Sequence, residues 1–274
     1  MQIMRQALAQ AVSDERIAHN PALHVKLPGA RGKSTTAVVD DPNQFLTAAQ
    51  VSNLVDATPW PYNVMVHLAA WAGLRAGELC GLQVGDLQLP VNRTNRLGKL
   101  RVERTVVLVN GALAYQEPKT QGSRRKVPLT ASTTALVRDY LAAHPRSDDP
   151  SAPLIPALRP GSTPAGPDLD WAQPLRHTVF YPLVFKPAVE RAGLNTAVVF
   201  HSLRHTYVSL CVAAGIPALE ISRFAGHSSV TTTLGIYAHL FESDHSAAMT
   251  ALGAMGQPAT GNVVPLRGRA VGTE

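Results

Sequence analysis

The sequence FHSLRHT, residues 200–206, decides how the rest of the chain is interpreted. On a helix, positions three apart share a face, so His201 and Arg204 would project together from the first turn. Ser202 is a suitable N-cap residue for that helix. A helix start that offers free N–H groups beside an arginine and a histidine can bind a phosphate. The apolar positions that follow predict a buried stripe on the opposite side, made of Leu203, Tyr207, Leu210, Cys211 and Ala214.

Two other interpretations of this segment are open on its sequence alone. His201 and Arg204 are more often plain surface residues near a helix cap than phosphate ligands. His201 and His205 have the spacing of two zinc ligands, but the glutamate expected between them in a metallohydrolase helix is absent. The zinc interpretation is therefore the weaker of the two.

A second segment, WAGLRAGEL at residues 71–79, combines a helix break with an ion pair. Gly73 would end one helix, and Arg75 would begin the next. Glu78 lies one turn later on the same side and can fix the guanidinium in a charge-assisted pair. An exposed ion pair is the more common outcome at this spacing.

A third segment, EPKTQGSRRKVPL at residues 117–129, places Lys119 at a strand end beside a Gly/Ser turn. A long amine on a hairpin can enter a DNA groove or deliver a proton. A solvated charge on a turn is the alternative.

A fourth segment, GHSSVTTTLGIYAH at residues 226–239, carries His227 after a helix-ending Gly226 and Tyr237 near the end of the next helix. Taken singly, both side chains would be regarded as structural, the tyrosine as a core aromatic.

In this order, the four segments resemble the tyrosine recombinase (phage integrase) family, from about residue 45 to about residue 253. The resemblance implies a mainly α fold with a small antiparallel β-sheet (α+β), similar to DNA breaking-rejoining enzymes. It also implies a set of site residues: Arg75, Lys119, His201, Arg204, His227 and Tyr237 as catalytic, and Glu78 in support. Ser202 stands where the family usually has Asp, and Ala225 replaces a common Leu.

The resemblance implies a chemistry that needs no metal and no cofactor. Arg75 and Arg204 would clamp the phosphate oxygens, and Tyr237 would attack phosphorus to give a covalent 3′-phosphotyrosine and a free 5′-hydroxyl. His201 would accept the phenol proton and Lys119 would protonate the departing 5′-oxygen. His227 would hydrogen-bond the phosphate or the leaving side. Because the phosphotyrosine conserves bond energy, religation would need neither ATP nor Mg²⁺.

The implied function is site-specific DNA recombination, in integration or excision of a mobile element. One alternative is an integrase remnant that binds DNA without cleaving it. Another is relaxation of DNA in the manner of a type IB topoisomerase.

The composition agrees with a DNA partner but does not decide it. The net charge is +6 and the pI is near 9.6, and many proteins with this balance never contact nucleic acid. With only Cys80 and Cys211, a disulfide framework is not expected. No apolar run approaches the roughly 20 residues needed to span a bilayer. We therefore expect a cytoplasmic protein without a membrane partner.

The chain is expected to contain several parts. Residues 1–22, with a helix over 1–19, look like the last helix of a truncated N-terminal core-binding (SAM-like) domain, and 23–44 look like a linker. The catalytic domain would cover 45–255, with a Pro-rich surface loop at 145–170 and a disordered tail at 256–274. The helix near 242–254 would dock on a neighbouring protomer within a homotetramer on double-stranded DNA, or else fold back on its own domain.

The local patterns predict the elements of the catalytic domain. A capping box at Thr47 announces a helix, and an Asn110-Gly111 turn predicts a β-hairpin. Further helices are expected at 61–74, 76–84, 131–143, 177–192, 202–214, 217–225 and 229–239, and strands at 100–109, 112–117 and 124–129.

Overall fold

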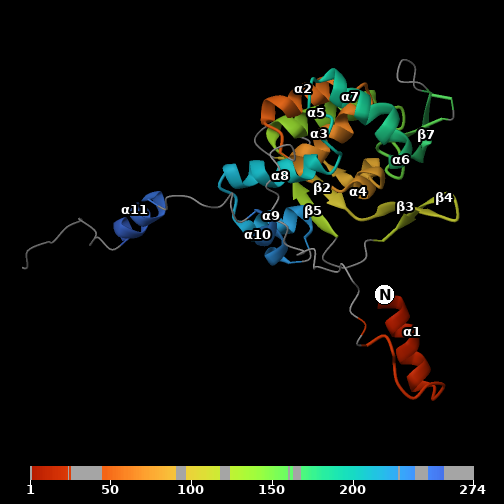
Figure 1. Cartoon of the computed structure of the whole chain (residues 1–274). Coiled ribbons are helices and arrows are strands. Elements are labelled where there is room, and N and C mark those ends of the chain that lie inside the picture. The colour runs from red at the N-terminus through yellow and green to blue at the C-terminus, as the bar shows by residue number, and fades with distance from the viewer. Residues whose placement is uncertain are drawn as a thin grey trace, which may run out of the picture. The chain divides into compact units, whose positions relative to one another are not determined.

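The computed structural model describes residues 2–23, 25, 45–90, 97–117, 124–159, 161–162, 168–227, 229–237 and 246–255. The chain divides into two units, residues 1–240 and residues 241–274. The larger unit combines many helices with small antiparallel sheets (Figure 1), which confirms the predicted α+β class.

The described helices follow the predicted order. In the larger unit they are α1 (Gln2–Ser13), α2 (Ala48–Ala57), α3 (Asn63–Ala72), α4 (Ala76–Cys80), α5 (Ala131–Ala143), α6 (His177–Phe180), α7 (Lys186–Arg191), α8 (Ser202–Ala213), α9 (Ala218–Ala225) and α10 (Val230–Tyr237). A 3₁₀ turn (Val84–Asp86) follows α4, and a π-helical turn (Tyr181–Phe185) joins α6 to α7. In the smaller unit the described helix is α11 (Ser246–Met255).

The described strands form three antiparallel sheets. They are β1 (Leu87–Gln88), β2 (Lys99–Val102), β3 (Thr105–Val109), β4 (Ala112–Gln116), β5 (Arg125–Pro128), β6 (Pro156–Leu158) and β7 (Leu169–Pro174). One sheet has the order β1-β2-β5, and the other two are the pairs β3-β4 and β6-β7. In the first sheet Leu100 pairs with Val127, and both side chains are buried in the core.

The prediction of a single strand at 100–109 is wrong, because the chain leaves the first sheet after Val102. Arg104 lies outside both strands and its Nη1 contacts Asp86 Oδ2 at 2.5 Å. Asp86 is buried, so this ion pair satisfies a charge that would otherwise be costly to bury. The chain re-enters regular structure at Thr105, in a different sheet.

The expected hairpin turn is confirmed. Asn110 and Gly111 both have positive φ, 49° and 84°, as a two-residue type I′ turn requires. The pairing Val109 to Ala112 closes the hairpin and continues through Thr105 to Gln116.

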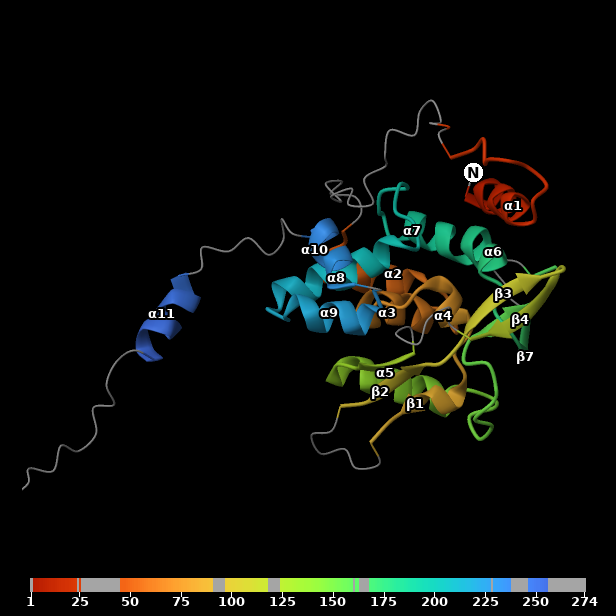
Figure 2. The same ribbon diagram turned by 90° about the horizontal axis from the view of Figure 1, so that it is seen from below.

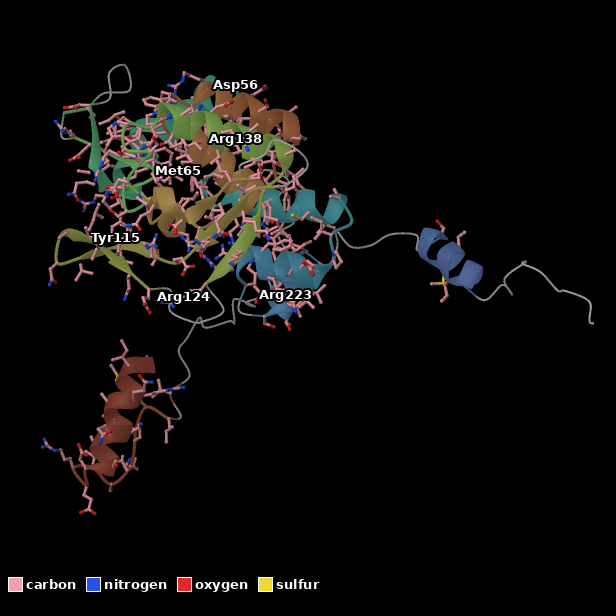
Figure 3. All side chains as sticks on the ribbon, turned by 180° about the vertical axis from the view of Figure 1, so that it is seen from behind. Asp56, Met65, Tyr115, Arg124, Arg138 and Arg223 are labelled. Carbon is pink, nitrogen blue, oxygen red and sulfur yellow. The ribbon has the colours of Figure 1, made fainter. Side chains whose placement is uncertain are left out.

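Helix α3 lies at the centre of the core and packs against α2, α4, α5 and α8. Its Met65 and Leu68 are fully buried, and Figure 3 shows Met65 among closely packed side chains. Helix α2 begins with the predicted capping box. Thr47 Oγ1 accepts from the Gln50 N–H at 3.2 Å, and Gln50 Oε1 accepts from the Thr47 N–H at 2.9 Å.

The surface loop expected at 145–170 is also wrong in part. Within it, Leu154 and Ile155 are fully buried and β6 pairs with β7. Two buried hydroxyls hold this segment: Tyr140 donates to the Leu154 carbonyl at 2.6 Å, and Tyr62 donates to the Pro156 carbonyl at 3.2 Å. The prolines of this segment predicted a surface loop, whereas its apolar residues form part of the hydrophobic core.

Helix α1 ends at Ser13, earlier than the expected residue 19. Glu15 adopts a left-handed conformation with a φ of 54°, which a helix cannot continue through. The following turn folds back on the helix, since Asn20 Nδ2 donates to the Arg5 carbonyl at 2.9 Å and Arg5 Nε donates to the Ala22 carbonyl at 2.9 Å.

Helices α8, α9 and α10 lie side by side and form one edge of the helical layer (Figures 1 and 2). Helix α9 also packs against β5, and α8 packs against α3. Three hydrogen bonds join the ends of these elements into one region. Arg204 of α8 donates to the Gly73 carbonyl after α3, Arg125 of β5 donates to the Phe224 carbonyl of α9, and His205 of α8 contacts Tyr237 at the end of α10.

Cys80 and Cys211 are both buried and are not bonded to each other. Among the described helices, none is both long and apolar enough to cross a membrane.

Candidate active site

Arg75 is held at the junction of α3 and α4. Helix α3 ends at Gly73 in the left-handed conformation, with a φ of 66°. A Cβ at this position would lie 2.2 Å from the Tyr207 ring, so only glycine fits between α3 and α8. Arg75 is the N-cap residue of α4, as expected, and its side chain remains 41% exposed.

The Glu78 carboxylate binds two arginines, Arg75 and Arg125. One carboxylate oxygen accepts from the Arg75 backbone N–H at 2.9 Å, and the other accepts from Arg75 Nη1 at 3.0 Å. Arg125, from β5, donates to both oxygens at 2.9 Å. Burial by itself would raise the pKa of Glu78, but the hydrogen bonds and charges of Arg125 and Arg75 lower it to about 2. The carboxylate is therefore ionised throughout the neutral range.

The C-terminal end of α9 binds the same two arginines through its carbonyls. Arg75 Nη2 donates to the Gly226 carbonyl at 2.8 Å, and Arg125 Nε donates to the Phe224 carbonyl at 2.6 Å. Free carbonyls at a helix C-terminus favour cations. Gly226 has a φ of 69°, and a Cβ there would lie 2.7 Å from Arg125 Nη1.

Arg204 is buried on the first turn of α8, with 3% of its surface exposed. Its Nη1 donates to the Gly73 carbonyl at 2.6 Å, whereas the buried Nη2 has no hydrogen-bond partner among the described residues. Burial, together with the charge of Arg75, lowers the pKa of Arg204 to about 9. The guanidinium is thus a cation at neutral pH, and one of its buried nitrogens has no partner among the residues that the structure describes.

His201 is the N-cap residue of α8 and keeps solvent-accessible surface. Partial burial and the charges of Arg204 and Arg75 lower its pKa. The expectation that Ser202 caps this helix is wrong. Ser202 is the first helical residue, and its Oγ accepts a hydrogen bond from the Val199 N–H at 3.2 Å, in the turn before α8.

Tyr237 is the last residue of α10 and is 1% exposed. Its hydroxyl shares a hydrogen bond with Nδ1 of His205, which lies one turn along α8 from His201. Burial raises the pKa of Tyr237 to about 12, although Arg204 acts in the opposite sense. Burial and the neighbouring His201 and Arg204 lower the pKa of His205 to about 4. At neutral pH both partners of this hydrogen bond are therefore uncharged.

His227 follows the C-cap Gly226, and its Nδ1 contacts Thr233 Oγ1 of α10 at 2.7 Å. Burial and the positive charges of Arg204, Arg75 and Arg125 lower the pKa of His227 to about 3. A neutral imidazole thus lies beside the arginine cluster.

The structure gathers most of the predicted site residues into one region. Arg75, Glu78, Arg204, His227 and Tyr237 are linked by hydrogen bonds or by electrostatic coupling, and His201 adjoins them through His205 and Arg204. Lys119 lies outside the described residues. Within the described ranges no group of three or more His, Cys, Asp or Glu side chains could hold a metal ion.

Two residues of this region were not identified from the sequence as parts of the site. His205 was considered only as a zinc ligand, although its position one turn after His201 places both on one helix face. Arg125 lies between two other basic residues, Arg124 and Lys126, in the strand expected at 124–129, and nothing in that pattern singles it out. Alternation in a strand separates Arg125 from Arg124 and Lys126, but it does not tell which side faces inward.

Comparison with known proteins points to one family. Residues 44–244 match the sequence pattern of the Phage integrase family. A tyrosine recombinase XerC-like protein of Caldanaerobacter subterraneus is 26% identical over 68% of this chain and 47% of its own length. The integrase of Staphylococcus phage L54a is 24% identical over 65% of this chain and 47% of its own length. The chain thus spans about half the length of these curated relatives.

Solved structures show the same fold. The Tn1549 transposon integrase in complex with transposon right end DNA superposes with a TM-score of 0.59 and 21% identity, over 92% of this chain and 76% of the other. Because the family pattern covers most of the sequence and the folds agree, this chain belongs to the phage integrase family.

Proposed function

We propose that this protein is a site-specific tyrosine recombinase that cleaves and rejoins double-stranded DNA through a covalent phosphotyrosine at Tyr237. The observation that carries the proposal is the buried Nη2 of Arg204 beside Arg75 and Tyr237, which has no hydrogen-bond partner in the part of the chain that the structure describes. A buried cation without a partner is costly unless an anion completes the site. A DNA phosphate is the anion that this family membership suggests.

Arg204 and Arg75 hold the phosphate in this mechanism. Arg204 is fixed through Nη1 by the Gly73 carbonyl and offers Nη2 to a phosphate oxygen. The terminal nitrogens of Arg75 each carry two N–H groups, and one on each is used by Glu78 or Gly226. Two fixed guanidiniums would stabilise the negative charge that develops on the non-bridging oxygens, where loss of one donor typically costs about 10²–10³ in rate.

Tyr237 supplies the nucleophile. Its hydroxyl oxygen would attack phosphorus, the P–O bond to the 5′-oxygen would break, and a 3′-phosphotyrosine would remain. Because burial raises the phenol pKa, the phenol proton has to leave as the O–P bond forms. We assign its acceptance to His201, which retains contact with solvent, and protonation of the 5′-oxygen to Lys119. His227, neutral and held by Thr233, would donate a hydrogen bond to the phosphate.

Glu78 and Arg125 support the clamp without contacting DNA. The ionised Glu78 carboxylate fixes Arg75 from below and is itself held by both terminal nitrogens of Arg125. This pairing keeps the guanidinium plane of Arg75 in one orientation.

We also propose the assembly that the family membership suggests. Residues 45–255 would form the catalytic domain, and α1 would belong to a DNA-contacting helical domain joined to it by residues 23–44. Helix α11 exposes Met249 and Leu252, about 60% each, and these apolar side chains would dock on a second protomer in a homotetramer on DNA.

The direct test is relaxation of supercoiled plasmid in EDTA, which requires no knowledge of the recombination site. The wild-type protein should relax the plasmid and leave protein–DNA adducts on denaturing gels, and Tyr237→Phe should do neither. Tyr181→Phe, on the π-helical turn, is the matched control and should retain activity. Relaxation that survives in Tyr237→Phe would contradict the proposal, and absence of activity from the wild-type protein would contradict cleavage by this chain alone.

A further inference from the structure

His205 contacts the hydroxyl of Tyr237 directly, although the predicted site assigned it no role. The contact joins Nδ1 of His205 on α8 to the phenol oxygen at the end of α10, 32 residues further along the chain. Of the two histidines on this face of α8, His205 is the one that touches the proposed nucleophile.

The ring of His205 is held from several sides. His201 packs against it edge-on, with ring centroids 4.8 Å apart and an interplanar angle of 89°. Phe45 packs against both His205 and Tyr237, at centroid separations of 6.5 and 6.4 Å. These contacts restrict the imidazole, so its hydrogen bond has a defined direction.

Phe45 is held in turn through the next residue in the chain. The backbone N–H of the adjacent Leu46 donates to Thr206 Oγ1 at 2.9 Å, and both residues are buried. Thr206 follows His205 on α8, so the same helical turn that carries the imidazole also anchors the segment that covers it. The nucleophile, its histidine and the covering aromatic are thereby joined to one element.

We propose that His205 is a positioning residue for Tyr237. Its Nδ1 hydrogen bond would hold the phenol oxygen close to the phosphate that Arg204 and Arg75 would bind. This inference rests on the proposed function, because it concerns the nucleophile of that reaction. Arg204 lies on the same turn of α8 and is electrostatically coupled to Tyr237. A phenol held by the neighbour of Arg204 stays near the phosphate that Arg204 would bind.

The charge state of the imidazole agrees with positioning rather than with proton transfer. Burial, His201 and Arg204 lower the pKa of His205 to about 4, which makes its ring a weak base. A base of that strength is poorly matched to a phenol whose pKa is raised. A neutral imidazole can still share a hydrogen bond with the phenol, as donor or as acceptor according to its tautomer.

Two substitutions separate the hydrogen bond from the rest of the imidazole. The side-chain amide of Asn lies near the position of Nδ1 and can donate or accept, so His205→Asn should keep the contact. His205→Leu fills a similar space and cannot make it. In the plasmid assay we expect His205→Leu to form adducts about 10²-fold more slowly, as for a misplaced reacting group. His205→Asn should stay within about fivefold of the wild-type rate, because it retains the hydrogen bond.

A second measurement needs no DNA. With 3-fluorotyrosine incorporated, the ¹⁹F resonance that disappears in Tyr237→Phe belongs to Tyr237. His205→Leu should shift this resonance, and His205→Asn should shift it less. A resonance that does not move in His205→Leu would overturn the contact, whatever the activity of that variant.

The outcomes distinguish the inference from the function on which it rests. No adduct with wild-type protein would overturn the proposed function itself. Wild-type adducts together with an unchanged or faster rate in His205→Leu would overturn only the role of His205. Equal loss of activity in His205→Asn and His205→Leu would also overturn positioning by this hydrogen bond.

Discussion

Arg125 donates one hydrogen bond from each terminal nitrogen to Glu78, at 2.9 Å in both cases, and both side chains are less than 10% exposed. Breaking a buried pair leaves an uncompensated charge and typically costs about 3–5 kcal/mol. We therefore predict that Arg125→Met lowers the free energy of unfolding by about 3 kcal/mol, as measured by urea denaturation.

The adjacent arginine provides the control for this prediction. Arg124 contacts Glu117 at 2.6 Å, but both side chains are largely exposed, at 47% and 81%. An exposed ion pair contributes roughly 0–1 kcal/mol. Arg124→Met should therefore unfold close to the wild-type urea concentration. Similar losses for the two variants would contradict the structural role given to Arg125.

Gly226 and Gly215 provide a second pair of matched variants, for which we predict different losses of stability and of DNA cleavage. The φ of Gly226, 69°, is unfavourable for alanine, and a Cβ would also lie 2.7 Å from the guanidinium of Arg125. Gly215 has a similar φ of 73° with open space around its Cβ. Gly215→Ala should cost about 1 kcal/mol of backbone strain and retain DNA cleavage. Gly226→Ala should cost more and lose most of the cleavage rate, because both Arg125 and Arg75 bind this turn.

Arg204 should be required for activity and unfavourable for stability. It is buried beside Arg75 and Arg125, and its Nη2 has no partner among the described residues. Removing such a cation relieves desolvation and repulsion, so Arg204→Met should raise the free energy of unfolding by about 1 kcal/mol. The same variant should form at least ~10²-fold fewer adducts per unit time. A large loss of stability would indicate that Arg204 is a structural cation instead.

Two histidines of the site predict how stability changes with pH. The folded pKa values of His205 and His227 are about 4 and about 3, below the ordinary value of 6.5. At pH values between these folded pKa values and 6.5, the unfolded chain therefore binds more protons than the folded chain. Stability is fully present above pH 6.5 and is lost as the pH falls toward the folded pKa values.

Between pH 7.5 and pH 5.0 each histidine should remove roughly 1–2 kcal/mol from the free energy of unfolding. Urea titrations at the two pH values measure the loss. In His227→Asn the difference between the two pH values should shrink by about 1 kcal/mol. An unchanged difference would mean that His227 is not buried as a neutral ring.

The sequence predicted local features well where a single residue carries a physical requirement. The Thr47 capping box, the Asn110-Gly111 turn and the Arg75–Glu78 pair all depend on contacts within four residues, and all are present. The fold class followed from the family that the four ordered segments resemble. Such signals are local, so they can be found without knowing the tertiary structure.

The long-range contacts could not be predicted from the sequence. The bond between His205 and Tyr237 spans 32 residues, and that between Arg125 and Glu78 spans 47. The break at Arg104 depends on a buried Asp86 that only the tertiary structure reveals. Ser202 was expected to cap α8 because serine favours caps, but the turn at Val199 uses its hydroxyl instead.

The identity of the residue that becomes linked to DNA tests the central claim most directly. Adducts formed on plasmid in EDTA would be digested with nuclease and trypsin, and mass spectrometry would locate the nucleotide on its peptide. We predict that the remnant lies on Tyr237, linked through a 3′-phosphate. A remnant on any other residue, or DNA cleavage without a covalent adduct, would contradict the account.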